Sequence, residues 1–370
     1  MDKDCYLFVS CPFGGTEVFM KNLKSYVDSR DDVPAYWLEI PHVDPSLMKG
    51  FGSLTNNWTL RASGATFSVI QGLHKEGRSV KAAFFNHLTA VSLLLGYRRR
   101  IPCILTVDTT PVLLNCDRDW YRTEGFQTRG VMERLSRGWT RRTYSAMRYL
   151  LPWSNHARHS LLDDYGAAHE RIVVLPPGID LSHWKPRCLK ADDHRKGLSV
   201  LFVGGEFVRK GGDTVLKLAR DDAFRHMDFH FVTHSFTGPA PENVHVYQGI
   251  TPNSGLLVKL YQECDVFVLP TRADYAPTNA VVEALAVGLP VITTGVGGLD
   301  DLITEGENGF VIPVGDSDIL GKRLIQLDSN RILLQRLKSN ARKYAEQNFD
   351  INLTGSRIID LLQESGSSDR

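Results

Sequence analysis

The sequence lacks the features that define several large classes of protein. Its six cysteines are scattered and include no Cys-x-x-Cys pair, so neither a zinc site nor a disulfide framework is indicated. No apolar run approaches the roughly 20 residues that span a bilayer, and the best candidate, LTAVSLLLGY, covers residues 88 to 97. The N-terminal MDKDCYLFVSCPFGG does not have the pattern of a secretion signal. We therefore expect a protein of the reducing cytoplasm that is not integral to a membrane.

An excess of charge of one sign is also missing. The 43 lysines and arginines nearly balance the 42 aspartates and glutamates, for a formal net charge of +1. Proteins that bind nucleic acid usually have a basic excess or a marked basic face, so no nucleic acid is expected as a partner. The 370 residues, 42% of them hydrophobic, are long for one soluble domain and comfortable for two.

The glycine-rich turns match neither of two common nucleotide-binding signatures. CPFGGTEVF and the later GVGG at 295 to 298 lack the third glycine of G-x-G-x-x-G. LFVGGEFVRKGG lacks the spacing of a P-loop. Nicotinamide chemistry is therefore disfavoured.

What the chain does contain is a regular alternation of β-rich runs and helical patterns, which is typical of strand-helix-strand units on parallel sheets. The runs are CYLFVS, TEVFMKNLKSYVD, KAAFFN, LTAVSLLLGY, CILTVD, YLLPWS, ARHSLLDDYG and RIVVLP, and then LSVLFVG, DTVLKLAR, DFHFVTH, NVHVYQG, GLLVKLYQEC, DVFVLPT and GFVIP. A Pro- and Gly-rich linker at 176 to 197 separates the two series. We predict an α/β protein with Rossmann-like domains over 1–185 and 186–345, and a helix at about 346–365 that packs back on the first domain.

Three stretches that follow predicted strands are candidates for ligand binding, because ligands of open α/β sheets bind beyond the carboxyl ends of the strands. In CPFGGTEVF, Gly14 and Gly15 let the backbone approach an anion at a helix start, although a plain tight turn would use the same glycines. LFVGGEFVRKGGDTVLKL places Arg209 and Lys210 beside glycine pairs, which suits a diphosphate. A solvated basic loop is the alternative.

The third stretch, RADYAPTNAVVEALAVGLPVITTGVGG, predicts a helix from about Thr278 to Val287 that ends at Gly288. Glu283 lies inside this apolar helix. A buried carboxylate needs hydrogen-bond donors, which either ligand hydroxyls or a structural ion pair would supply.

In this order, GGTE, LPPGIDLSHWKP, LFVGGEFVRKGG, VYQGI and the long stretch from DVFVLPT to GFVIP resemble the retaining family 4 glycosyltransferases of the GT-B fold. The resemblance implies two Rossmann-like domains whose parallel sheets face an interdomain cleft. It implies a metal-independent enzyme without a cofactor that moves a sugar from a nucleotide-diphosphate sugar, UDP- or GDP-type, to a hydroxyl of a glycan, lipid-linked or small-molecule acceptor. The alternatives are a nucleotide-sugar epimerase of the same fold and a non-catalytic carbohydrate-binding protein.

The resemblance also assigns roles to single residues. Arg209 and Lys210 would neutralise the donor diphosphate, and Glu283 would hold the ribose hydroxyls. The expected donor-binding residues are Gly14, Gly15, Gly205, Tyr247, Gln248, Tyr275, Pro277, Thr278 and Asn279, and the expected catalytic residues are Asp108, Arg209, Lys210, Asp274 and Glu283.

The chain departs from the family pattern at three positions. Eight residues before Glu283 the Glu-x7-Glu motif would place an acid, but Tyr275 stands there and Asp274 lies one position earlier. Gly205 replaces an arginine that is common in the family, and Arg209 could supply the guanidinium. Asp108 replaces a histidine, and either binds sugar and acceptor groups or makes a local turn. His87, in FFNHLTA, is a further candidate for acceptor or sugar contact, with a structural role as the alternative.

Two other charged patterns bear on metals and membranes. Asp117-Arg118-Asp119 lacks the strand context of a metal site, and the histidines 226, 230 and 234 lie on a strand pattern that spreads them apart, so no metal is predicted. Region 118 to 148 interleaves arginines with Trp120 and Trp139. Such a basic helix either contacts an anionic membrane surface, which would make the protein peripheral to the membrane, or contacts an anionic acceptor. A solvated face is the alternative.

Overall fold

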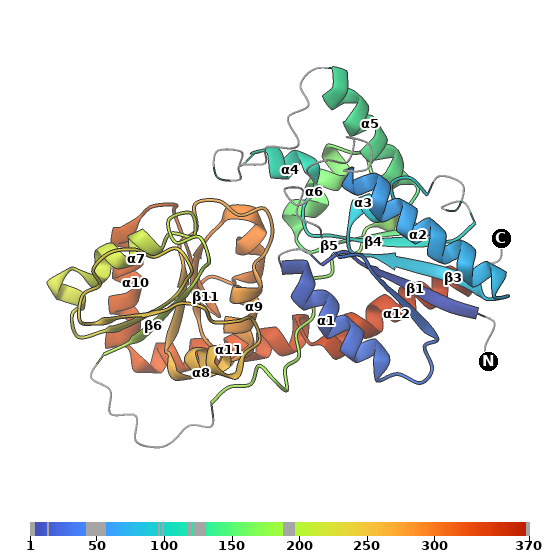
Figure 1. Ribbon diagram of the computed structural model, residues 1–370. Helices are drawn as coiled ribbons and strands as arrows, with labels where there is room; N and C mark the ends of the chain where they lie inside the picture. The colour runs from blue at the N-terminus through green and yellow to red at the C-terminus, as the bar shows by residue number, and fades with distance from the viewer. Residues whose placement is uncertain are drawn as a thin grey trace. The chain divides into compact units, whose positions relative to one another are not determined.

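The chain divides into two compact units in the computed structural model (Figure 1). Unit 1 comprises Met1–Gly178 and Ile351–Arg370, and unit 2 comprises Ile179–Asp350. The structure describes residues 4–12, 15–41, 57–94, 97, 100–116, 120, 131–187 and 197–367. None of the helices in these ranges is long and apolar enough to cross a membrane.

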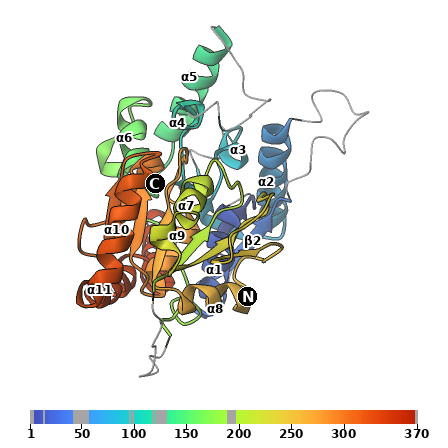
Figure 2. The ribbon, with the colours of Figure 1, turned by 90° about the vertical axis from the view of Figure 1, so that its left-hand side faces the viewer.

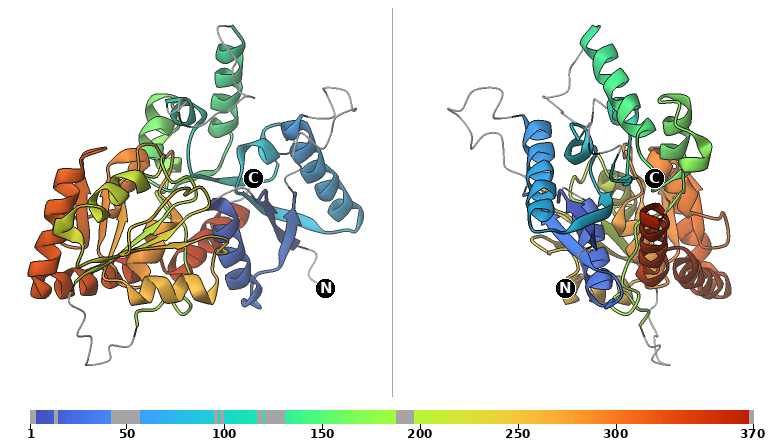
Figure 3. Two further views of the ribbon diagram at one scale, coloured as in Figure 1. Left: turned by 60° about the vertical axis from the view of Figure 1, so that its left-hand side comes forward. Right: turned by 90° about the vertical axis from the view of Figure 1, so that its right-hand side faces the viewer.

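Unit 1 contains a parallel five-stranded sheet in the order β2-β1-β3-β4-β5. Its strands are β1 (Asp4–Ser10), β2 (Ala35–Glu39), β3 (Ser79–Phe85), β4 (Cys103–Val107) and β5 (Tyr149–Pro152). Its described helices include α1 (Gly15–Asp28), α2 (Trp58–Lys75), α3 (Leu88–Val91), α4 (Pro111–Cys116), α5 (Val131–Ser145), α6 (Asn155–Asp163) and α12 (Ile351–Ser367). The helix α5 (green) projects from this unit in both views of Figure 3.

The two faces of this sheet are covered by different helices, because alternate strand residues point to opposite sides. Phe8 and Phe84 belong to the core that contains side chains of α1 and α12. Leu7 and Ala83 belong to the core that contains side chains of α2. The last helix of the chain is therefore part of unit 1, where it packs against α1 and β3.

Unit 2 contains a parallel six-stranded sheet in the order β11-β10-β9-β6-β7-β8. Its strands are β6 (Ser199–Val203), β7 (Asp228–Val232), β8 (Val244–Tyr247), β9 (Val266–Leu269), β10 (Val291–Thr294) and β11 (Gly309–Ile312). Its helices include α7 (Gly212–Ala219), α8 (Gly255–Glu263), α9 (Asn279–Ala286), α10 (Ser317–Ser329) and α11 (Arg331–Asn348). Helices α10 and α11 lie side by side (Figure 2).

The structure differs from the sequence-based expectations in the segments around the linker. Unit 1 ends at Gly178 rather than at residue 185, because Leu181 and Trp184 are buried in the core of unit 2. RIVVLP, expected as a strand, makes only an isolated bridge at Ile172 beside β5. The segment itself ends at Pro176 and Pro177 follows, and proline cannot donate a ladder hydrogen bond. The apolar stretch expected as a helix over 88 to 97 is α-helical only at Leu88–Val91 among its described residues.

Candidate functional site

The candidate site in unit 2 lies where the strand order of the sheet reverses. Strands β6 and β9 are neighbours at the centre of the sheet, and the chain continues outward from them in opposite directions. The crevice beyond the carboxyl ends of such a strand pair is the usual ligand site of an open α/β sheet. Arg209 and Lys210 follow β6, and Asp274 follows β9. The topology therefore brings the neighbours Arg209 and Lys210 together with Asp274, which lies 64 residues after Lys210.

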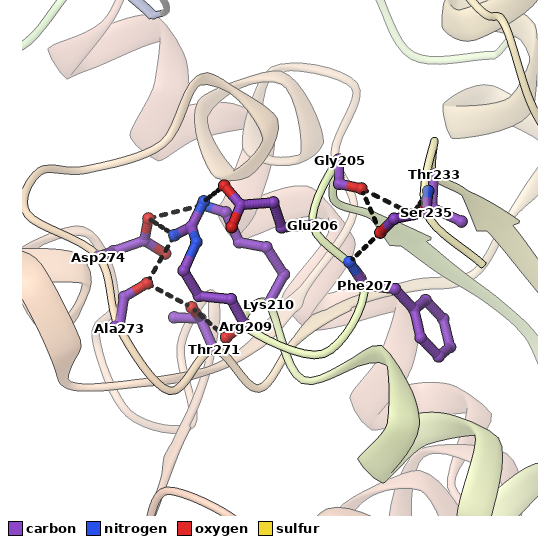
Figure 4. Close-up of polar contacts among 10 residues, drawn as sticks. All are labelled: Gly205, Glu206, Phe207, Arg209, Lys210, Thr233, Ser235, Thr271, Ala273 and Asp274. Carbon is purple, nitrogen blue, oxygen red and sulfur yellow. Dashed lines mark hydrogen bonds and ion pairs between the residues drawn. The ribbon is translucent and has the colours of Figure 1, made fainter. Parts of the chain in front are cut away.

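The Asp274 carboxylate contacts both cations (Figure 4). Its Oδ1 accepts a hydrogen bond of 2.6 Å from Lys210 Nζ and one of 3.3 Å from Arg209 Nη1. Arg209 Nη1 also donates to the Ala273 carbonyl at 2.8 Å, and Arg209 Nη2 pairs with Glu206 at 3.0 Å. The side chains of Arg209 and Asp274 are 9% and 6% exposed. We call Glu206, Arg209, Lys210 and Asp274 the ion-pair cluster.

Burial and pairing act in opposite directions on the charges of this cluster. Burial lowers the pKa of Lys210, and the neighbouring Asp274 carboxylate opposes that shift. The Arg209 hydrogen bond lowers the pKa of Glu206. Two cations and two carboxylates balance one another here, so the positions of the cations are fixed before any ligand arrives.

The glycines around this cluster are explained by close packing. A Cβ at Gly204 would lie 2.8 Å from the Cβ of Lys210, and one at Gly211 would lie 2.0 Å from the Pro270 carbonyl oxygen. Gly211 also has a φ of +81°, which favours glycine. The carbonyl of Gly205 accepts hydrogen bonds from Thr233 Oγ1 and Ser235 Oγ at 3.0 and 2.9 Å. A donor contact at Gly205 stays a prediction.

Arg272 and Asp213 support the cluster, and the sequence analysis missed both. Arg272 makes two hydrogen bonds, of 2.6 and 2.9 Å, with the carboxylate of Asp213 in the first turn of α7. Its guanidinium also donates to the Val208 carbonyl, and its backbone N–H donates to the Arg209 carbonyl at 2.9 Å. The loops after β6 and β9 are thereby tied together on both sides of Arg209. The position of Arg272 in the loop that follows β9 was the available signal.

Glu283 is buried in α9 and is held by a phenol. It is 5% exposed, and its Oε2 accepts a hydrogen bond of 3.0 Å from the hydroxyl of Tyr261 in α8. Burial raises the pKa of Glu283 to about 7, and the Tyr261 hydrogen bond opposes that rise. Among the described residues no ion pair to Glu283 is found. The structural partner of this carboxylate is therefore the Tyr261 hydroxyl and not the cation that the sequence-based alternative expected. Tyr261 was not identified from the sequence.

The predicted donor loop leads into the start of α9. Thr278 is the N-cap residue, with an extended backbone, and Asn279 is the first helical residue. The Thr278 hydroxyl is buried and finds no hydrogen-bond partner within the described parts of the chain. Tyr275 and Pro277 precede it in the same loop. A Cβ at Gly297 would lie 2.4 Å from the Asp274 carbonyl oxygen, so the GVGG turn packs behind this loop.

The predicted nucleobase contacts lie at the edge strand of the sheet. The Tyr247 hydroxyl is 3.1 Å from His230 Nδ1, and Gln248 Nε2 donates to the Phe236 carbonyl at 3.0 Å. Of the histidines that were weighed as metal ligands in the sequence, His226 pairs with Asp328 at 2.8 Å. His230 lies on β7, as the alternating pattern predicted.

Unit 1 has its own point of strand-order reversal, between β1 and β3. Asn86, which follows β3, is 3% exposed. Its Oδ1 accepts from the Cys11 N–H at 2.7 Å, and its Nδ2 donates to the Cys11 carbonyl at 3.0 Å. We call this pair the amide clamp. It holds the chain just before Gly15, the first residue of α1, whereas Gly14 lies outside the described residues.

His87 and Asp108 each make local contacts at strand ends of unit 1. His87 is the N-cap of α3, and its Nδ1 accepts from the Thr89 N–H at 3.3 Å and lies 2.7 Å from the Thr89 hydroxyl. Asp108 Oδ1 accepts from the Thr109 N–H at 2.8 Å. Burial raises the pKa of Asp108 to about 6. The local turn is therefore present, and a role of either side chain toward a ligand stays a prediction.

Of the Arg-rich region 118 to 148, the structure describes Trp120 and the residues from 131 onward. In α5, Leu135 and Trp139 are 63% and 38% exposed, and Arg134 and Arg142 are exposed as well. The triplet Asp117-Arg118-Asp119 lies outside the described residues.

Comparison with known families identifies relatives for most of the chain. The sequence model of "Glycosyltransferase Family 4" matches residues 13–183, and that of "Glycosyl transferases group 1" matches residues 239–344. The putative colanic acid biosynthesis glycosyltransferase WcaL of Escherichia coli is 27% identical over 224 residues, which are 55% of this chain and 53% of that protein. The match thus spans about half the length of this curated relative.

Solved structures show the same fold. The sucrose-phosphate synthase of Thermosynechococcus elongatus matches with a TM-score of 0.73 at 16% identity, over 99% of this chain and 100% of that one. HepE of Anabaena, solved in complex with UDP, matches with a TM-score of 0.69 at 17% identity, over 98% and 100% of the two chains.

Proposed function

The chain belongs to the family 4 glycosyltransferases and has their GT-B fold, and we propose that it is a retaining, metal-independent enzyme. It moves a hexose from a nucleotide-diphosphate sugar to an acceptor hydroxyl. The observation that carries this proposal is the ion-pair cluster at the strand-order reversal of unit 2, where Lys210 and Arg209 are fixed by Asp274. Two buried cations at such a crevice suit an anionic ligand.

The chemical demand is stabilisation of a leaving group. As the bond from the sugar to the phosphate oxygen breaks, the departing nucleoside diphosphate gains negative charge. Cations that are already oriented stabilise this charge without a reorganisation cost at the moment of reaction. The acceptor hydroxyl forms the new bond on the face that the diphosphate leaves, and a phosphate oxygen accepts its proton. No protein nucleophile is then needed.

The other predicted residues take their roles around this step. Glu283 binds the ribose hydroxyls through its carboxylate, and Asp274 with the loop to Asn279 contacts the sugar and the phosphates. Asp108 and His87 are the candidates for the acceptor or the transferred sugar. The remaining donor contacts are assigned to Gly14, Gly15, Gly205, Tyr247 and Gln248.

The names of relatives suggest which substrates to test first. UDP and UDP-glucose have priority because the HepE protein of the same fold was solved with them. A glycan acceptor fits the colanic acid assignment of the Escherichia coli relative. GDP sugars form the second donor class.

Calorimetry with UDP, GDP and their sugars, with and without EDTA, tests the proposal. We expect one nucleotide class to bind with EDTA present, and Lys210→Ala to weaken that binding by more than tenfold. Binding of no nucleotide by the wild-type protein would overturn the proposed function. Binding without sugar transfer or hydrolysis would instead favour a non-catalytic carbohydrate-binding role.

We also propose that α5 contacts the anionic inner face of a membrane. Its exposed arginines and exposed Leu135 and Trp139 form the pattern of an interfacial helix. Sedimentation with phosphatidylglycerol vesicles should capture the protein, and phosphatidylcholine vesicles should not. The double variant Arg134→Glu, Arg142→Glu should lose binding, whereas a charge-matched variant in unit 2, Arg225→Glu with Arg331→Glu, should retain it. Equal capture of both variants would exclude this contact.

A further inference from the structure

Tyr261 is the hydrogen-bonding partner of Glu283 in α8. Its hydroxyl lies 3.0 Å from Glu283 Oε2 and 3.2 Å from the Ala280 carbonyl oxygen. A phenol has a single proton to donate. A charged acceptor forms the stronger bond, so the proton goes to the carboxylate when Glu283 is ionised.

The ring of Tyr261 is held rigidly. It is 0% exposed, and it stacks on Phe267 of β9 with ring centroids 5.7 Å apart. Trp184 meets it edge-on at 5.3 Å. The Trp184 indole in turn donates to Asn253 Oδ1 at 3.2 Å. A side chain fixed on two sides can orient a neighbour with little loss of conformational entropy on ligand binding.

The geometry leaves one carboxylate oxygen of Glu283 for another partner. Oε2 is taken by Tyr261, whereas for Oε1 no hydrogen bond or ion pair is found among the described residues. A buried carboxylate oxygen gains free energy from a hydroxyl donor. Ribose hydroxyls of a donor nucleotide are such donors.

We propose that Tyr261 is a positioning residue for donor binding: it holds Oε2 of Glu283 so that Oε1 faces the ribose, and it favours the ionised carboxylate. This inference rests on the proposed role of Glu283 toward the donor. Tyr261 itself does not touch the donor, so its effect passes through Glu283.

Two cations of α11 have partners other than the Glu283 carboxylate. Arg342 of α11 donates to the carbonyls of Ala286 and Trp184 at 2.6 and 2.8 Å. Lys338 of the same helix pairs with Asp265 at 2.7 Å. The raised pKa of Glu283, about 7, has burial as its cause and Tyr261 as the one counteracting group. The ionisation of Glu283 therefore depends on this phenol.

The test is the pH dependence of nucleotide binding by Tyr261→Phe, measured by calorimetry with UDP and GDP between pH 6 and pH 9. Loss of the hydrogen bond raises the pKa of Glu283, so fewer molecules carry the carboxylate at neutral pH. We expect binding about fivefold weaker than wild type at pH 7 and less than about twofold weaker at pH 9. Titration of the nucleotide phosphates affects both proteins alike and cancels in the ratio.

Two controls separate positioning from general damage. Tyr344→Phe removes another hydrogen-bonded phenol of unit 2, whose hydroxyl donates to the Asp301 carbonyl, and should leave the binding ratio near one at every pH. In a Glu283→Gln background, Tyr261→Phe should lose its pH-dependent effect, because there is no carboxylate to ionise.

The outcomes separate the positioning role of Tyr261 from the proposed function. If the wild-type protein binds a nucleotide and Tyr261→Phe weakens it equally at all pH values, or not at all, the positioning role is wrong and the proposed function stands. If the wild-type protein binds no nucleotide, the proposed function fails first. A pH-dependent loss that persists in Glu283→Gln would also contradict the inference.

Discussion

The two points of strand-order reversal are built from different chemistry. In unit 2 the loops after β6 and β9 meet through the ion-pair cluster, with Asp274 between Lys210 and Arg209. In unit 1 the loops after β1 and β3 meet through the amide clamp, in which Asn86 bonds both polar groups of Cys11. The same topological position therefore carries charge in one unit and neutral hydrogen bonds in the other.

This difference indicates what each position is for. Buried ion pairs contribute little net stability, because desolvation of the charges offsets their attraction. Binding of an anionic ligand therefore explains this cluster better than a contribution to the stability of the fold does. The amide clamp satisfies buried backbone groups at low electrostatic cost, which fits a loop that must keep its shape beside a ligand.

The largest expected effect comes from removing one charge of the ion-pair cluster. Lys210→Met leaves Asp274 buried with Arg209 as its remaining cation in the cluster, and such a change costs about 3 kcal/mol of unfolding free energy. Urea denaturation measures the loss. Nucleotide binding, measured by calorimetry at a temperature where the variant is folded, should fall more than tenfold.

The double variant Lys210→Met, Asp274→Asn tests whether stability and binding are separate. Removing both charges should restore most of the stability, because no uncompensated carboxylate is left. Binding should stay weak, since the cation is still missing. Recovery of both properties together would show that the cluster is structural only.

The neutral counterpart in unit 1 should respond less strongly. Asn86→Ala leaves the N–H and carbonyl of Cys11 without their buried partner, at a cost of about 1 to 3 kcal/mol. Because no charge is involved, the destabilisation should be the same in 0.05 M and 0.5 M salt. A cost that changes with salt, seen in denaturation curves, would contradict the neutral character of the clamp.

Much of the fold could be predicted from the sequence because the strand runs are short, apolar and β-branched. The helix with Glu283 was predicted within two residues, since Gly288, with a φ of +79°, ends it as expected. Lys210 was predicted to lie at the ligand end of a strand, and Asp274 was expected at the site from the family resemblance, but the ion pair between the two was not predicted. The prediction of a strand at RIVVLP was wrong, because apolar composition does not show whether a segment finds a continuous hydrogen-bonded partner strand.

The positions of Tyr261, Asn86 and Arg272 could not be predicted, since each acts on a residue distant in sequence. Tyr261 lies 22 residues from Glu283 and Asn86 lies 75 from Cys11. A buried tyrosine in an apolar helix and an asparagine at a strand end have many equivalent uses. Only the strand order decides which neighbours they meet.

A smaller effect is expected for Asp108, and it has a defined sign with pH. Burial raises the pKa of Asp108 from 3.8 to about 6, so the folded protein binds this proton more tightly than the unfolded chain. Unfolding free energy then falls as the pH rises from about 4 to 6. Asp108→Asn should remove this fall and be about 1 kcal/mol more stable than wild type above pH 6. Denaturation at pH 4, 6 and 8 measures both. If the difference in unfolding free energy between Asp108→Asn and the wild type is the same at all three pH values, the titration of Asp108 does not cause the pH dependence.

The smallest effect is expected at His87, where a local cap and a ligand contact can be told apart. His87→Ala removes the side chain that accepts from the Thr89 N–H, at a cost of about 1 kcal/mol, whereas asparagine can cap the helix and should cost less than about 0.5 kcal/mol. Thermal denaturation of both variants measures this difference. If His87 only caps α3, sugar transfer by His87→Asn should equal that of the wild type. If the imidazole contacts the acceptor or the sugar, His87→Asn should lower transfer at unchanged stability, and unit 1 would then supply a ligand-binding side chain next to its amide clamp.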